Sequence, residues 1–208
     1  LHPATVVFQF AAQQTVQVAY KPIMAGVRDH DPIARLSRKG TLTFFEVFER
    51  GQRNSGMHAP MWLGDTATAS LMWKHLSAIH QKVRGEVIDV GEPGLGGYAA
   101  SEPRDAMWAV LTEMHSMLLL YEGFAFREGR LPHRLTDAER DQFVREVGAY
   151  CRLVGSPEDE IPGSMAELEA LYDRYADLFG HTPTMNTHPA SGADYQEVIG
   201  ESLRANFH

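Results

Sequence analysis

The segment Trp73-Lys-His-Leu-Ser-Ala-Ile-His-Gln-Lys-Val-Arg-Gly85 is the most informative part of this sequence. Apolar residues recur in and beside it at the spacing of a helix with one buried face, namely Met72, Leu76, Ile79 and Val83. His75 and His80 flank this stripe on opposite sides, so either can face a buried group without leaving the helix. Spacing alone favours a plainer interpretation of both, as half-buried histidines that bond a carbonyl or water.

The composition is that of a globular protein, with 44% hydrophobic and 22% charged residues. A length of 208 residues predicts one domain whose core needs no disulfides. The net charge of -8 argues against nucleic acid as a partner, because phosphate binding needs a basic surface. The one cysteine, Cys151, excludes an internal disulfide framework, and its apolar neighbours predict a buried, inert thiol.

The sequence shows no segment expected to span a membrane or to act as a signal peptide. Its longest apolar run, 117–120, is far shorter than the roughly twenty residues that a spanning helix needs. The first residues lack a basic start and an apolar run, which is compatible with a cytoplasmic location. The chain starts at Leu1 in place of Met, which is compatible with a preceding segment. Ten histidines favour metal or haem chemistry, though only weakly.

Cap and breaker signals predict an all-α fold of roughly six to eight helices, and no segment alternates as a strand does. Asp31-Pro32 has the form of an N-cap followed by proline, and Thr136-Asp-Ala-Glu139 and Ser164-Met-Ala-Glu167 have the form of capping boxes. The expected helices cover residues 5–20, 32–48 with a kink at Gly40, 66–84, 101–126, 136–155 and 164–178. The expected loops are 51–65, 86–100 and 180–208, the last with a short helix near 198–203, and 26–30 is expected to be a short connection or a single helical turn.

Two further groups of residues are candidates for a functional site. Arg35, Arg38 and Lys39 form a basic cluster, which is either a solvated patch or a contact for an anionic or oxygen-bearing ligand. His115 lies at the centre of the apolar face of the 101–126 helix, so it is a second candidate for a buried ligand. A methionine and aromatic stripe like the one around Trp108 is more often core than a cofactor pocket.

Short segments along the chain follow the order of a known catalytic domain. They are Tyr20-Lys-Pro-Ile-Met-Ala-Gly-Val-Arg-Asp-His30, Asp31-Pro-Ile-Ala-Arg-Leu36, Ile79-His-Gln-Lys-Val-Arg-Gly85, Tyr98-Ala-Ala-Ser-Glu-Pro103 with Trp108, Leu135-Thr-Asp-Ala-Glu-Arg140, Arg145-Glu146, Leu153-Val-Gly155 and Ile161-Pro162. Together they cover about residues 20–175. In this order they resemble the catalytic domain shared by MpaB-type oxygenases and rubber oxygenases (latex-clearing proteins).

The resemblance implies one all-helical domain over 1–208 that encloses haem b and oxidises a small apolar organic substrate with dioxygen. The family's proximal iron ligand matches His80, and Arg84 in the same motif joins the expected cofactor-binding residues. Arg35 matches the family's distal arginine and is expected to contact dioxygen or a propionate through charge-assisted hydrogen bonds. Arg38 and Lys39 stand where rubber oxygenases carry lysine and threonine, which makes them catalytic candidates beside Arg35. Apolar residues around Phe44 and Trp108 are expected to line a substrate cavity.

This sequence departs from the rubber-cleaving pattern and leaves other functions open. No glutamate precedes Glu46, whereas the rubber-cleaving type uses one upstream of its arginine, so we expect an MpaB-like activity. One alternative is a haem-binding sensor or carrier without turnover. Another is a non-haem metal site at His75, His80 and His115, although the paired Glu-x-x-His motif of di-iron bundles is absent from the sequence. We also expect the 66–84 and 103–126 helices to pack together.

Overall fold

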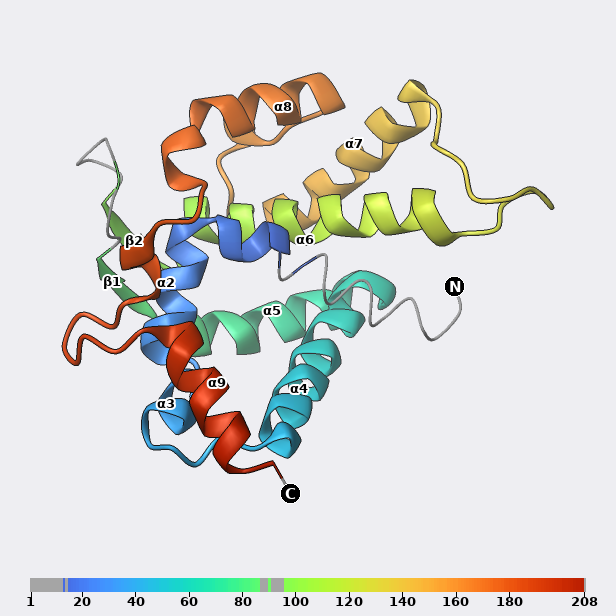
Figure 1. The fold of residues 1–208 in the computed structure, drawn as a ribbon. Coiled ribbons are helices and arrows are strands. Elements are labelled where there is room, and N and C mark those ends of the chain that lie inside the picture. Colours follow the sequence, from blue (N-terminus) through green and yellow to red (C-terminus); the bar gives the residue numbers. More distant parts are fainter. Residues whose placement is uncertain (1–12, 14, 87–89, 91–95, 208) are drawn as a thin grey trace. The chain divides into compact units, whose positions relative to one another are not determined.

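The computed structural model describes residues 13, 15–86, 90 and 96–207, and it is predominantly helical (Figure 1). The all-α prediction is therefore confirmed at the level of the class. The chain divides into two compact units, one of residues 1–20 with 102–180 and one of residues 21–101 with 181–208. The expectation that they form one domain stays a prediction.

The first unit is built on the long helix α6 (Pro103–Phe124), which packs against α7 (Asp137–Leu153). Helix α8 (Met165–Arg174) packs in turn on α7. Its core holds Trp108, which is fully buried and lies within 4.8–5.7 Å, centroid to centroid, of four rings: Tyr20, Tyr172, Tyr175 and Phe179. Trp108 is thus a core residue in this aromatic cluster.

The second unit combines helices with a small antiparallel sheet (Figure 1). Its helices are α2 (Lys21–His30), α3 (Pro32–Arg38), α4 (Phe44–Leu63), α5 (Thr66–His80) and α9 (Tyr195–Ala205). Helix α4 packs on α5, and α3 packs on α9. Strand β1 (Arg84–Glu86) pairs with β2 (Gly97–Ala99), with Gly85 opposite Tyr98, and both strands contact α2. The expectation of no strand is therefore wrong.

The predicted helix starts are largely confirmed. Asp31 caps α3 by accepting a hydrogen bond from the Ile33 amide at 2.8 Å, with Pro32 directly after the cap. Thr136 and Glu139 form the expected reciprocal capping box. Ser164 also caps α8, but the Glu167 carboxylate accepts from the Gly163 amide at 2.6 Å, so this second box is only half as predicted. The short helix expected near 198–203 is part of α9.

The predicted 32–48 helix is divided into two helices, and the predicted 51–65 loop is wrong. Helix α3 ends at Arg38, and Gly40 follows with a φ of +69°, a left-handed conformation that glycine adopts without strain. Thr43 then starts α4 with a capping box to Glu46, and that helix continues to Leu63 with Pro60 inside it. Packing against α5 offsets the low helix propensity of the glycines and proline in this segment.

Several boundaries also differ from those that the sequence indicated. Lys21-Pro22 starts α2 instead of only ending a helix, and 26–30 belongs to α2, because proline is well suited to a first turn. Helix α5 stops at His80, short of Gly85. Helix α6 is capped by Glu102, without a side-chain bond, in place of Ser101. The expected 5–20 helix lies mostly outside the described residues. Within this range, the described residues 13 and 15–19 are helical.

Two other expectations concern the interior. Cys151 is fully buried, and burial raises the pKa of its thiol to about 12, which confirms a buried cysteine that stays protonated. The helices expected to pack together, now α5 and α6, belong to different units. Their contact therefore stays a prediction.

Candidate functional site

His80 is a half-buried histidine at the last position of α5. Its Nδ1 atom is buried and has no hydrogen-bond partner among the described residues. Burial, as the largest cause, and electrostatic interaction with His58 and Arg50 lower the pKa of His80 to about 4, although a hydrogen bond with the Ala100 backbone acts in the opposite direction. His80 is therefore neutral near pH 7 and has a nitrogen lone pair that can bind a metal.

The two residues that act electrostatically on His80, Arg50 and His58, lie on α4. Arg50 Nε donates to Asp31 Oδ2 at 2.8 Å, and its Nη1 donates to Asn54 Oδ1 at 3.3 Å. Asp31, the N-cap of α3, thereby holds this arginine in place. His58 lies two turns further along α4. Because the arginine is fixed by a carboxylate, its charge stays near the imidazole and helps to keep His80 neutral.

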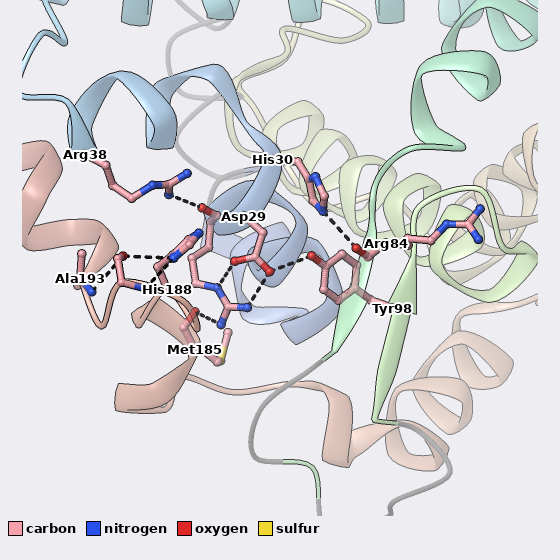
Figure 2. A network of polar contacts seen from close by, with 10 residues as sticks. Asp29, His30, Arg38, Arg84, Tyr98, Met185, His188 and Ala193 are labelled. Atoms are coloured by element: carbon pink, nitrogen blue, oxygen red, sulfur yellow. Dashed lines mark hydrogen bonds and ion pairs between the residues drawn. The ribbon is translucent and has the colours of Figure 1, made fainter.

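The chain directly after His80 is fixed to α2 through the two-stranded sheet. The Val83 amide donates to the His80 carbonyl at 2.9 Å, and the Ala100 amide donates to the Val83 carbonyl at 2.9 Å. In β2, the Tyr98 hydroxyl donates to Asp29 Oδ2 at 2.8 Å (Figure 2). Strand β2 therefore links the end of α5, at His80, to a carboxylate at the end of α2.

The carboxylate that receives Tyr98 is itself held by a buried arginine. Arg28 is fully buried and contacts Asp29 through two hydrogen bonds, of 2.6 and 2.8 Å, and its Nη1 donates to the Met185 carbonyl at 3.2 Å. Burial tends to raise the pKa of Asp29, but the hydrogen bonds from Arg28 and Tyr98 lower it overall. A half-buried carboxylate with this many donors stays charged and holds Tyr98 firmly.

Two glycines allow the close approach of these elements. A Cβ atom on Gly85 would lie 2.6 Å from the Tyr98 hydroxyl oxygen, far inside a normal contact. A Cβ atom on Gly26 would lie 3.3 Å from Val83 Cγ1. The glycine in the His80 motif is therefore needed because the Tyr98 ring covers it.

The other predicted site residues share the unit of His80 but do not contact it. Arg35 is exposed, and its side chain has no polar partner among the described residues. Arg38 donates to the Arg28 carbonyl at 2.8 Å, and Lys39 is the exposed C-cap of α3. Arg84 is exposed and donates to the Gln81 carbonyl at 2.9 Å. No hydrogen bond or ion pair among the described residues joins any of these four to His80, so their roles stay predictions.

The two rival histidines have ordinary surroundings. His75 is exposed on α5. His115 lies in the other unit, where its Nδ1 is 3.3 Å from the Tyr172 hydroxyl in a hydrogen bond, beside a small apolar cavity. Burial lowers its pKa. Within the described part of the chain, no three His, Cys, Asp or Glu side chains gather as a metal site.

Sequence reasoning missed most of the residues around His80. His58 lies in the 51–65 segment that composition indicated was a loop, and Arg50 lies just before it, so no periodicity connected them to α5. Asp29 and Tyr98 were visible only as parts of the family motifs. Their pairing across 69 positions depends on the strand pair that the sequence did not reveal.

The fold and the site define a predominantly helical protein with a neutral histidine whose buried nitrogen is available to a metal or cofactor. The family model described as "ER-bound oxygenase mpaB/B'/Rubber oxygenase, catalytic domain" matches residues 1–194. The chain therefore belongs to this oxygenase family. Neither the curated proteins nor the solved structures include a significant match to the chain. In the described part of the chain, no helix has the length and apolar character needed to cross a membrane.

Proposed function

We propose that this protein is a haem b-dependent oxygenase in which His80 binds the iron as the proximal ligand. The observation that carries the proposal is the buried Nδ1 atom of His80, which has no hydrogen-bond partner among the described residues. A buried polar atom without a partner is costly, and a neutral imidazole is the form that haem iron takes as a ligand. The lowered pKa keeps His80 in this form at neutral pH.

The remaining residues have distinct roles in this proposal. Haem, when bound, supplies an iron that binds and activates dioxygen. Arg35 donates hydrogen bonds to dioxygen or to a propionate, for which its exposed and unpaired guanidinium is available. Arg38 and Lys39 follow Arg35 by three and four positions, so they add positive charge on the same side of α3. Arg84 interacts with a propionate beside the His80 motif. The substrate is a small apolar organic molecule, as the family resemblance implies.

An absorption spectrum with matched variants tests this proposal. Protein produced with adequate haem is expected to give an intense Soret band and to consume oxygen with an apolar substrate. His80→Ala should fold but lose most of the haem, because a coordination bond is lost. His75→Ala, on the exposed side of the same helix, is the control and should keep the haem. A normal Soret band in His80→Ala would refute the assignment, and haem without any oxygen consumption would indicate a sensor or carrier.

A further inference from the structure

A short hairpin follows α6 in the first unit and projects beyond the helix end (the yellow loop in Figure 1). Arg127 and Arg130 face each other as a single antiparallel bridge, and the Arg130 amide donates to the Arg127 carbonyl at 2.8 Å. The two residues between them, Glu128 and Gly129, have φ values of +51° and +71°. Positive φ at both central residues is the geometry of a tight two-residue hairpin turn. The hairpin therefore has a defined shape.

The hairpin presents two large apolar side chains to solvent. Phe126 and Leu131 flank the bridge and are 69% and 74% exposed. Side chains alternate between the faces of a strand, so this pair points away from the face of Arg127 and Arg130. Exposing an aromatic and an aliphatic side chain together, next to a turn that places a glutamate at positive φ, offers no folding advantage. The pair is therefore suited to contact something outside this chain.

Arg127 connects the hairpin to the end of α6. Its Nη1 donates to the Tyr121 carbonyl at 3.2 Å, and its Nη2 donates to the His133 carbonyl. The guanidinium also lies 4.8 Å from the centre of the Tyr121 ring. These contacts join both ends of the hairpin to the helix. Phe126 and Leu131 are thus already held in position, so that binding through them costs little conformational entropy.

The charge of this region is opposite to that of the chain. Residues 124–134 contain three arginines (Arg127, Arg130 and Arg134) and one acidic residue, Glu128, whereas the chain carries -8. Two of the arginines are partly neutralised, because Arg130 pairs with Glu128 at 2.6 Å and Arg134 with Asp137 at 3.2 Å. These ion pairs are exposed, and exposed pairs are weak enough to exchange partners. An apolar tip flanked by arginines complements an anionic lipid surface.

We propose that the 126–131 hairpin is a docking tip for an anionic bilayer surface. Phe126 and Leu131 enter the boundary between headgroups and acyl chains. The exposed Arg130 and Arg134 stay at the level of the lipid phosphates, where a guanidinium can donate two hydrogen bonds, while Arg127 holds the hairpin on α6. The interaction needs no spanning helix. It depends only on the first unit, and it does not rest on haem binding or on the proposed activity.

Co-sedimentation of the full chain with vesicles tests the proposal. Binding is expected to vesicles that contain phosphatidylserine and to fall as salt rises. The double variant Phe126→Ser with Leu131→Ser should bind at least tenfold more weakly, because both apolar side chains leave water on docking. Arg134→Ser should bind roughly fivefold more weakly. Leu63→Ser, on the 85% exposed Leu63 of α4, is the matched control and should bind as the unchanged protein does.

Several results would overturn the proposal. One is a lack of binding to vesicles with phosphatidylserine while the protein is folded by circular dichroism. Another is equal binding to vesicles of phosphatidylcholine alone, which would remove the role of the arginines. A third is equal loss of binding in the Leu63→Ser control and in the tip variant. Self-association that the tip variant abolishes, without vesicle binding, would instead assign the hairpin to a contact between two copies of the chain.

Discussion

The buried Arg28 and the half-buried His80 differ in how the second unit accommodates a basic side chain away from water. Arg28 is fully buried and forms an ion pair with the Asp29 carboxylate at 2.6 Å. His80 has no carboxylate partner among the described residues, and its pKa falls to about 4. Burying a charge is costly unless it is paired, so the first residue is structural and the second is neutral and available to a ligand.

Arg35 is expected to affect the reaction more than cofactor retention. Arg35→Ala should leave the haem content close to normal, because the exposed guanidinium makes no hydrogen bond among the described residues that holds the fold together. Activity or oxygen affinity should fall about 10- to 100-fold, the loss expected for one hydrogen bond from a charged group. Arg204→Ala, an exposed arginine on α9, is the control. Complete loss of haem from a folded Arg35→Ala protein would show that its role is to hold the cofactor.

His115 is expected to make stability depend on pH. Burial and the charge of Arg140 lower its pKa, against the opposing carboxylates of Glu169 and Glu122. Because the pKa in the folded state lies below the unfolded value of about 6.5, the unfolded state binds more protons in the window just below pH 6.5. This contribution to stability is therefore complete above pH 6.5 and is lost as pH falls through that window.

The variant His115→Gln isolates this contribution, because glutamine can hydrogen-bond the Tyr172 hydroxyl but does not titrate. Its free energy of unfolding, measured by denaturant titration at several pH values, should decline less between pH 6.5 and 5 than that of the unchanged protein. All other groups titrate in both proteins, so their effects cancel. Parallel pH profiles would mean that His115 titrates alike in the folded and unfolded states.

At the level of elements, signals within one turn of helix predicted structure well, and signals that depend on distant contacts did not. Asp31-Pro32 and Thr136 to Glu139 mark real helix starts, because a cap is complete within four residues. The helical state of 51–63 depends on packing against α5, which composition cannot show. Strands β1 and β2 have only three residues each, too few for an alternating pattern to be recognised.

The pair of strands after His80 is expected to be sensitive to one methyl group. Gly85→Ala would place a Cβ atom 2.6 Å from the Tyr98 hydroxyl oxygen and displace a ring that Asp29 holds. Overpacking of this kind costs about 1–3 kcal/mol of unfolding free energy. Gly97→Ala in the facing strand is the matched control, because its nearest neighbour would be the Gly85 carbonyl oxygen at 3.8 Å. Equal stability of the two variants would contradict this account.

At the level of the whole molecule, the helical class followed from the sequence, but the arrangement around His80 did not. The class depends on the many helical segments, so errors in their ends do not change it. The surroundings of His80 combine α2, α4, α5 and β2, whose contacts join residues up to 69 positions apart. The family motifs indicated His80, and the structure adds the physical reason why its imidazole is neutral.

Thermal unfolding with and without haem is expected to show how far the effect of ligand binding reaches. A ligand at 100 times its Kd stabilises the folded state by about 2.7 kcal/mol. For a chain of this length, each kcal/mol raises Tm by roughly 2–4 °C, so haem should raise it by about 5–10 °C. His75→Ala should show this rise and His80→Ala should not.

If the chain is one domain, as its length predicts, a single transition should move as a whole. If the two units unfold independently, only the transition of the unit that contains His80 should move, because ligand binding stabilises only what unfolds together with the site.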